Sequence, residues 1–480
     1  MDTKKLRQKI LDLAIHGKLV PQDPNDEPAS VLLERIRKEK EQLIKEGKIK
    51  APKKSKSAGD TSHYPKENLP KGWIITDLDS LCTTINGLWK GVKGPLETIG
   101  VIRNANFTKE FTLDYSKIEY IDVESRSFEK RYLDDGDIIV EKSGGSDNYP
   151  VGRSILYNGE SRKYSFSNFT MSLRLIDKRS VLPKYLYYVL QQKYRRGDMK
   201  QMQTQTTGLH NLLTDIFLSM PIPIPPKEEQ KRIIERVDAL FTVVSGIDAL
   251  QGDLAHSVDA AKSSILELAI HGKLVPQNPS DEPAIELLKR INPDFTPSHN
   301  LHYGESLPNG WTCGLFGELN QHHNKSEDPM ASPEKEYELY SVPIYETGRP
   351  EFLLGKAIGS TKQLVSKGEV LLCKINPHLN RSWVVSHYRK ELKCIASSEW
   401  LVFRSEAVLP EYARLFFMSP AFKDLMLSNV SGVGGSLMRA RASAVNNYPI
   451  WVPPLNEQER IVQAVRQMNA TLESMTSILE

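Results

Sequence analysis

The sequence has few cysteines, little net charge and no long apolar run, and each shortage excludes a class of protein. Its 480 residues include four cysteines that stand singly, without the C-x-x-C pair of a zinc knuckle or redox couple. No stretch of about 18 apolar residues could cross a bilayer, and the N-terminus lacks the apolar centre of a signal peptide. We therefore expect reduced thiols and a cytoplasmic location. With 63 basic and 60 acidic side chains, any nucleic-acid binding would depend on local clusters of cations.

Enzyme motifs are missing as well. No G-x-x-x-x-G-K-[ST] sequence is present, which excludes a P-loop ATP site. An adenine methyltransferase would need a glycine-rich turn and an N/D-P-P-Y/F tetrapeptide, which Asn446-Asn447-Tyr448-Pro449 resembles only superficially. A nuclease centre of Asp137, Glu141 and Lys142 is disfavoured, because strand alternation would spread these residues over both faces. We predict no catalytic residue, no metal site and no cofactor in this chain.

Internal repeats organise the sequence instead. Residues 11–36 (LDLAIHGKLVPQDPNDEPASVLLERI) and 266–291 (LELAIHGKLVPQNPSDEPAIELLKRI) differ at only six of 26 positions. An L-P-x-G-W block begins at Leu69 and again at Leu307, and PIPIPPKEEQKRIIERV from Pro221 matches PIWVPPLNEQERIVQAV from Pro449. The order of the blocks is the same in both copies, which indicates tandem duplication of one module.

The repeated blocks frame two stretches with little similarity to each other. We expect an N-terminal frame segment at 1–68, variable domains at 69–220 and 307–448, a central conserved region at 221–306 and a conserved helix at 449–480. The first segment would hold the end of a long helix, a short helix and a basic linker at 45–56, which is predicted to be disordered. Two unlike inserts on one scaffold suggest two different recognition surfaces.

Both proline-rich blocks are followed by a coiled-coil pattern. After Pro226, with Glu228 and Glu229 suited to a helix start, apolar residues recur at steps of three and four with one polar break at Gln251. Asn456 and Glu459 predict a capping box at the second start. The seam residues are Ile233, Val237, Leu240, Val244, Ile247, Leu254, Val258, Ala261, Ile265 and Leu268, and, in the second copy, Ile461, Val465, Met468, Leu472, Met475 and Leu479.

The second long helix is divided between the two ends of the chain. Leu6, Ile10 and Leu13 match the end of the central seam, and Gly17 matches Gly272 as a helix stop. The duplication is therefore cyclic. We predict an α+β fold in which two mixed α/β domains are joined by two long antiparallel coiled-coil helices related by a pseudo-two-fold axis. The central helix would be roughly 55 Å long, and joining Glu480 to Met1 would give a second helix about three residues shorter.

With duplicated LAIHGKLVPQ blocks, duplicated P-P-x-x-E-Q helix starts and two inserts opened by L-P-x-G-W, the chain resembles the specificity subunits of type I restriction-modification enzymes. The resemblance implies that the inserts are target recognition domains, each recognising half of a bipartite asymmetric DNA site. It also implies that the long helices set the spacer and dock two methyltransferase subunits, which nuclease and translocase subunits can join. S-adenosylmethionine, ATP and magnesium would belong to those partners.

Loops after predicted strands supply the candidate DNA contacts. Lysine there can neutralise a phosphate, glutamine and asparagine can pair with adenine, and arginine with guanine. A solvated surface loop is the alternative interpretation. In the first variable domain the candidates are Lys142, Ser143, Gly144, Arg153, Asn168, Gln203, Thr204, Gln205 and Thr206. In the second they are Lys374, Asn376, Asn380, Arg381, Ser397, Ser436, Arg439 and Arg441.

Two other functions stay open. The chain could be the recognition part of a fused restriction-methylation enzyme, although no methylase or nuclease motif supports this. It could also be an adaptor that joins proteins through its coiled coil without sequence-specific DNA binding.

Overall fold

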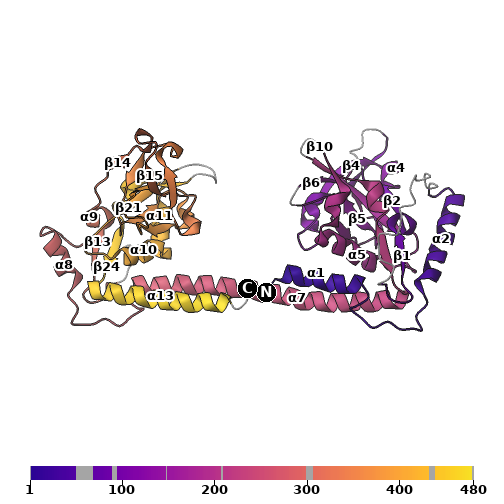
Figure 1. Cartoon of the computed structure of the whole chain (residues 1–480), viewed down its shortest axis with the longest axis horizontal. Coiled ribbons are helices and arrows are strands. Elements are labelled where there is room, and N and C mark those ends of the chain that lie inside the picture. The colour runs from indigo at the N-terminus through magenta and orange to yellow at the C-terminus, as the bar shows by residue number, and fades with distance from the viewer. Residues whose placement is uncertain are drawn as a thin grey trace. The chain divides into compact units, whose positions relative to one another are not determined.

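A computed structural model describes residues 2–49, 69–88, 94–146, 149–206, 209–298, 306–431 and 438–477. The chain forms two compact units, residues 1–250 and 251–480, and the boundary between them falls inside the 44-residue helix α7 (Lys227–Ile270). Each unit combines helices with mostly antiparallel sheets (Figure 1), which gives the α+β class predicted. Within the described ranges, every helix is too short or too polar to span a membrane.

Unit 1 contains a four-stranded sheet, two three-stranded sheets and one strand pair. Its strands are β1 (Ile74–Asp77), β2 (Cys82–Asn86), β3 (Leu96–Ile102), β4 (Glu119–Glu124), β5 (Ile138–Glu141), β6 (Ser143–Gly145), β7 (Ser154–Leu156), β8 (Tyr164–Phe166), β9 (Thr170–Leu175), β10 (Gln203–Thr206), β11 (Leu209–Leu212) and β12 (Pro221–Ile224). Its helices before α7 are α1 (Thr3–Ile15), α2 (Ala29–Lys45), α3 (Leu78–Leu81), α4 (Ser125–Phe128), α5 (Pro183–Arg196) and α6 (Thr214–Leu218). The strand orders are β2-β9-β5-β7, β4-β3-β8, β10-β11-β6 and β1-β12.

Unit 2 is built from a five-stranded sheet, a three-stranded sheet and two strand pairs. Its strands are β13 (Thr312–Leu315), β14 (Ser326–Glu327), β15 (Glu336–Tyr340), β16 (Glu351–Leu354), β17 (Lys362–Leu364), β18 (Val370–Cys373), β19 (Ser382–Val384), β20 (Lys393–Ala396), β21 (Trp400–Phe403), β22 (Val430–Ser431), β23 (Arg439–Ala440) and β24 (Pro449–Val452). Its helices after α7 are α8 (Ala284–Ile291), α9 (Phe316–Leu319), α10 (Pro410–Met418), α11 (Pro420–Ser428), α12 (Ala442–Val445) and α13 (Leu455–Ser477). The strand orders are β14-β17-β20-β15-β16, β19-β18-β21, β13-β24 and β22-β23.

The repeated sequence blocks form the same buried contacts inside each unit. Strand β1, which directly follows the first L-P-x-G-W block, pairs with the proline-block strand β12, as β13 does with β24 after the second block. In unit 1 the indole N–H of Trp73 and the side-chain amide of Gln22 both donate to Glu229, at 3.0 and 3.1 Å. In unit 2 the side-chain amide of Gln277 likewise donates to Glu457, at 3.2 Å, and the buried Trp311 takes the place of Trp73 in the sequence block. The blocks are far apart in sequence, and these contacts join them into one framework.

A fully buried glutamine attaches each sheet domain to this framework. Gln230, on the first turn of α7, accepts from the N–H of Leu182 at 2.8 Å and donates to the carbonyls of Ser180 and Pro225. In unit 2 the same roles belong to Gln458, Leu409, Ala407 and Pro453. An unpaired buried polar group costs about 1–3 kcal/mol. These bonds therefore hold the start of α5 or α10 firmly against the long helix.

Helices α1 and α13 run antiparallel to the parts of α7 beside them (Figure 1). In unit 1, Arg7 near the start of α1 pairs with Asp248 at 2.7 Å. Asp26, beyond the end of α1, pairs with Arg232 near the start of α7, also at 2.7 Å. The corresponding pairs of unit 2 are Lys262 with Glu473 and Asp281 with Arg460. Each unit thus contains a two-helix antiparallel pair.

Burial varies along the predicted seam, and Val258, in the second half of α7, is buried like the residues near the start of each helix. Ile233, Val237, Val244, Ile461 and Val465 are buried, and Leu240, Leu254, Ile265 and Leu472 are half-buried. The prediction is wrong for Leu268, Met468 and Met475, whose side chains are exposed. The first turns of α13 pack against α10 as well as α7, so their buried residues belong to the core of unit 2.

Most helix ends follow the sequence signals, with one exception. α7 begins immediately after Pro226, and Gly17 and Gly272, beyond α1 and α7, have φ values of +64° and +65° that favour glycine. The capping box at Asn456 is wrong, because α13 begins one residue earlier. The Asn456 side chain instead contacts Asp281. The basic linker lies largely outside the described residues.

Candidate nucleic-acid interface

In unit 1 several predicted contact residues meet at one end of the sheets. The chain leaves β5 at Glu141 and enters β6, which pairs with β11. The N–H groups of Lys142 and Ser143 both donate to the carbonyl of Phe169, at 2.8 and 3.1 Å, and the N–H of Leu212 donates to the carbonyl of Lys142. We call Lys142–Gly145, Asn168–Phe169 and strands β10 and β11 the first polar edge.

Three asparagine amides bind Lys142 or Ser143 at the first polar edge, two from other segments and one from β11. Lys142 donates to Asn86 at 3.0 Å, and burial lowers the pKa of its ammonium group. The Ser143 hydroxyl donates to Asn211 at 2.6 Å, and the Asn104 amide donates to the Ser143 carbonyl. The exposed apolar side chains nearby are Tyr149, Phe169 and Leu209. Polar groups beside flat apolar ones suit contact with phosphates and base edges.

Unit 2 assembles a corresponding second polar edge from Lys374–Asn376, Ser397–Glu399 and β23. The N–H of Lys374 donates to the carbonyl of Glu399 at 3.0 Å, and the N–H of Ala440 donates to the carbonyl of Lys374 at 2.9 Å. An isolated bridge pairs Ile375 with Arg439, and the N–H of Asn376 donates to the carbonyl of Met438. The side chains of Arg439 and Glu399 form an ion pair of 3.0 Å.

Strand register shows which positions of the two edges are equivalent. Glu141 pairs with Thr170 in unit 1, as Cys373 pairs with Trp400 in unit 2. The next residue in each unit is a lysine, Lys142 or Lys374. Its backbone N–H donates to the carbonyl of the residue just before the paired strand, β9 or β21. The equivalent pairs are therefore Lys142 with Lys374, Ser143 with Ile375, Phe169 with Glu399 and Asn211 with Arg439.

Two of the predicted contact residues, Arg153 and Arg381, donate to backbone carbonyls of their own unit. Arg153 and Arg381 occupy equivalent positions, since their carbonyls accept from Glu141 and Cys373. Arg153 donates to the carbonyls of Phe107 and Asn104, and Arg381 to the carbonyl of Ile375. Both arginines are therefore held by their own unit.

The remaining predicted residues have varied surroundings. The side chain of Gln203 accepts from the N–H of Val151, and Asn380 donates to the carbonyl of Met418 at 2.6 Å. Gly144 has φ +105°, with the Asn104 amide 3.2 Å from the place where a Cβ would stand. Thr204 and Arg441 are exposed, whereas Asn168 and Ser397 are half-buried in turns. Gln205 and Thr206 complete β10, and Ser436 lies outside the described residues.

Sequence reasoning missed the residues that complete both edges. Asn86, Asn104 and Asn211 come from three separate segments and contact Lys142 or Ser143. Glu399 was overlooked although it follows the predicted Ser397 by two positions. These residues carry no local motif, because strand pairing brings them to the edge.

The acidic residues considered for a nuclease centre have structural partners. Asp137 is fully buried and bound by Arg174 at 2.7 Å. Glu141 lies 3.3 Å from Arg153.

Possible metal ligands are also paired within the chain. In unit 2, His322 contacts Glu369 at 2.8 Å. Across the described ranges, no three histidine, cysteine or acidic side chains group as metal ligands would.

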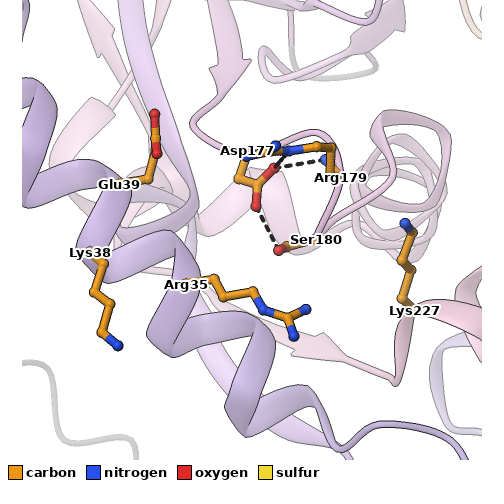
Figure 2. A pocket seen from close by; sticks show the side chains of 7 residues that line it. All are labelled: Arg35, Lys38, Glu39, Asp177, Arg179, Ser180 and Lys227. Atoms are coloured by element: carbon orange, nitrogen blue, oxygen red, sulfur yellow. Dashed lines mark hydrogen bonds and ion pairs between the residues drawn. The ribbon is translucent and has the colours of Figure 1, made fainter.

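A cavity of about 520 Å³ lies elsewhere in unit 1, between α2, the loop after β9 and the start of α7 (Figure 2). It is lined by Arg35, Lys38, Glu39, Asp177, Arg179, Ser180 and Lys227. The carboxylate of Asp177 accepts hydrogen bonds from the Ser180 hydroxyl at 2.7 Å and from the Nε of Arg179 at 3.2 Å. At the equivalent first position of α13, Leu455 replaces Lys227. This cavity shares no lining residue with the first polar edge and belongs to the framework.

Comparison with known proteins agrees with this architecture. A family model described as the type I restriction modification DNA specificity domain matches residues 70–248. The chain is 25% identical over 558 aligned residues to the EcoEI type I restriction enzyme specificity subunit of Escherichia coli, covering 99% of this chain and 91% of that protein. It is 33% identical over 335 residues to the EcoAI specificity subunit of Escherichia coli, covering 60% and 55%.

A solved structure supports the fold. It was determined to explain complex assembly and conformational transition of the type I R-M system, and one of its chains superimposes with a TM-score of 0.58. The match covers 85% of this chain and 93% of that one, at 16% sequence identity. At this identity the likeness concerns the arrangement of helices and strands.

Proposed function

We propose that this chain is a specificity subunit of the type I restriction-modification family and that it recognises a bipartite asymmetric DNA site with two separate domains. Residues 69–220 would bind one half-site through the first polar edge. Residues 307–448 would bind the other through the second polar edge.

The observation that carries this proposal is the equivalence of the two edges. Both edges place a lysine directly after a buried strand and a polar residue on the strand beside it. A lysine in that place can bind a phosphate whatever the sequence. Asn211 and Arg439 differ in the bases they suit, adenine for an amide and guanine for a guanidinium. One backbone arrangement with different side chains is what two unlike half-sites require.

Partner subunits would supply the chemistry. We propose that this chain is not catalytic in its own right and docks two methyltransferase subunits, with nuclease and translocase subunits joining them in the cytoplasm. S-adenosylmethionine, ATP and magnesium would be bound by those partners. Val243 and Leu250 of α7 are 61% and 69% exposed, and such apolar surface is available for a partner to cover.

The long helices would fix the spacing between the half-sites. α7 contributes to both units, and α1 and α13 each pair with part of it. We propose that these pairs form one antiparallel coiled coil of pseudo-two-fold symmetry that acts as a ruler. Its length would set the number of unspecified base pairs.

The experiment is to express this chain with the methyltransferase encoded beside it and map adenine methylation in the host genome. A bipartite motif with a fixed gap, lost when this chain is omitted, is the expected result. Methylation that is unchanged without this chain would overturn the proposal and favour an adaptor role. Methylation by this chain alone would favour the fused enzyme.

A further inference from the structure

The second polar edge contains one feature that the first does not, a paired arginine and carboxylate at its surface. The Nε of Arg439 lies 3.2 Å from one carboxylate oxygen of Glu399, and its Nη2 lies 3.0 Å from the other. The two side chains remain 47% and 26% exposed. Glu399 raises the pKa of Arg439. The guanidinium is therefore held in one orientation while still in contact with solvent.

Both members of the pair stand on fixed backbone. The carbonyl of Glu399 accepts from the N–H of Lys374 at 3.0 Å, and its own N–H donates to the Ser397 hydroxyl. Trp400, the next residue, is buried in the core. Arg439 lies in β23 and is bridged to Ile375. Both side chains therefore extend from backbone that is hydrogen-bonded to the segment Lys374–Ile375 or bridged to it.

From this geometry we infer that Glu399 is a positioning residue, which orients Arg439 to recognise a guanine in the half-site bound by unit 2. The inference rests on the proposed function. A guanidinium has five N–H donors in a rigid plane, and Glu399 uses the edge formed by Nε and Nη2. The opposite edge, formed by Nη1 and the second hydrogen of Nη2, has the spacing to donate to O6 and N7 of guanine together.

Holding the arginine in advance strengthens this recognition. An exposed arginine on its own samples many rotamers and loses that freedom on binding, whereas a paired one has lost it already. In unit 1, Asn211 takes the place of Arg439 and Phe169 takes the place of Glu399. The arginine therefore has a carboxylate beside it, whereas the asparagine does not. A carboxylate thus stands at this position in the unit that has an arginine to position, and a phenylalanine stands there in the unit that has an asparagine.

The test compares methylation motifs directed by the wild-type chain and by Arg439→Ala, Arg439→Lys, Glu399→Gln and Glu399→Ala, each with the methyltransferase. Binding of oligonucleotides with each base at the candidate position gives the affinities. Glu336→Gln is the matched control, since Glu336 makes a comparable exposed pair with Arg389 in unit 2, at 3.1 Å to each oxygen.

We expect Arg439→Ala to relax one guanine position of one half-site to any base, with a loss of tenfold or more in discrimination and no change in the other half-site. Arg439→Lys should keep part of the preference. Glu399→Gln and Glu399→Ala should lower guanine discrimination several-fold, the alanine variant more, without altering thermal stability. Glu336→Gln should match the wild type.

Three outcomes would overturn the inference while leaving the proposed function intact. The first is a wild-type bipartite motif that Arg439→Ala and Arg439→Lys leave unchanged. The second is guanine discrimination that falls with Arg439→Ala and stays at the wild-type value in both Glu399 variants. The third is discrimination that depends on Glu399 and not on Arg439, which would mean that the carboxylate binds cytosine directly. A wild-type chain that directs no motif would overturn the proposed function itself.

Discussion

The indole N–H of Trp73 donates a 3.0 Å hydrogen bond to the carboxylate of Glu229, 156 positions further along the chain. Gln22 donates to the same carboxylate, so one buried residue joins three repeated blocks. Glu229→Ala would leave both donors without this acceptor. We expect the free energy of unfolding of unit 1 to fall by about 1–3 kcal/mol. Urea unfolding, with hydrogen exchange of β1 and β12 to locate the effect, measures it.

Glu228→Ala is the control for this experiment. Glu228 is the exposed neighbour and makes a surface pair with Lys231. Its replacement should change the free energy of unfolding by no more than about 0.5 kcal/mol. Equal effects of the two substitutions would contradict the role given to Glu229.

The equivalent carboxyl of unit 2 predicts a pH dependence. Burial raises the pKa of Glu457 above its ordinary 4.5, against an opposing hydrogen bond from Gln277. Folding therefore favours the protonated carboxyl, and the stability that this contributes is lost as the pH rises through the folded-state pKa. Glu457→Gln resembles the protonated form at every pH. Its free energy of unfolding, relative to the wild type, should increase between pH 4.5 and neutrality.

Urea unfolding at several pH values follows this difference. Glu459→Gln, at an exposed position of the same helix, is the matched substitution. A pH-dependent difference of the same size in both variants would show that the effect does not come from the buried carboxyl.

Lys142 is expected to bind a phosphate at the first half-site. Lys142→Ala should weaken binding to all DNA sequences by a similar factor, and should reduce the slope of log affinity against log salt by about one. Titration of labelled duplexes at several salt concentrations measures both quantities. Lys163→Ala, which removes a surface cation paired with Glu160, should leave the slope unchanged. A changed base preference in Lys142→Ala would argue against a phosphate contact.

The length of α7 is expected to set the gap in the DNA site. Inserting four residues in α7 and four in α13, its repeated counterpart, adds about one turn, roughly 6 Å, to each helix. At about 3.4 Å per base pair, the spacer should lengthen by about two base pairs while both half-sites stay the same. Motifs from methylation mapping give the result directly. An altered half-site with an unchanged spacer would contradict the ruler.

The framework could be predicted in detail because its signals are local and periodic. Helix α7 begins at Lys227, directly after the proline block, and Gly272 adopts the positive φ expected of a helix stop. Burial along the seam was predicted less well. Met468 and Met475 fit the heptad pattern and are exposed, because a repeat of seven residues fixes which face an apolar residue takes and not which neighbour covers it.

The candidate site was predicted only in part. Lys142 and Lys374 were found because each follows a recognisable strand, and the structure gives them equivalent backbone contacts. Arg153 and Arg381 have the chemistry of DNA contacts and yet donate to backbone carbonyls of their own unit. Composition shows what a side chain can bind, whereas only its surroundings show whether it is already occupied.

By itself, the sequence determined the duplication, its cyclic order, the helix stops at Gly17 and Gly272 and the resemblance to type I specificity subunits, since all of these are written in contiguous blocks of residues. Only the tertiary structure decided which side chains form each polar edge. The pairing of Arg439 with Glu399 joins positions 40 residues apart. It exists because β18 and β21 bring Lys374 and Glu399 together while Arg439 is bridged to the residue beside that lysine. The physical reason is that strand pairing joins segments far apart in the sequence, and the pattern of one strand does not identify the strand with which it pairs.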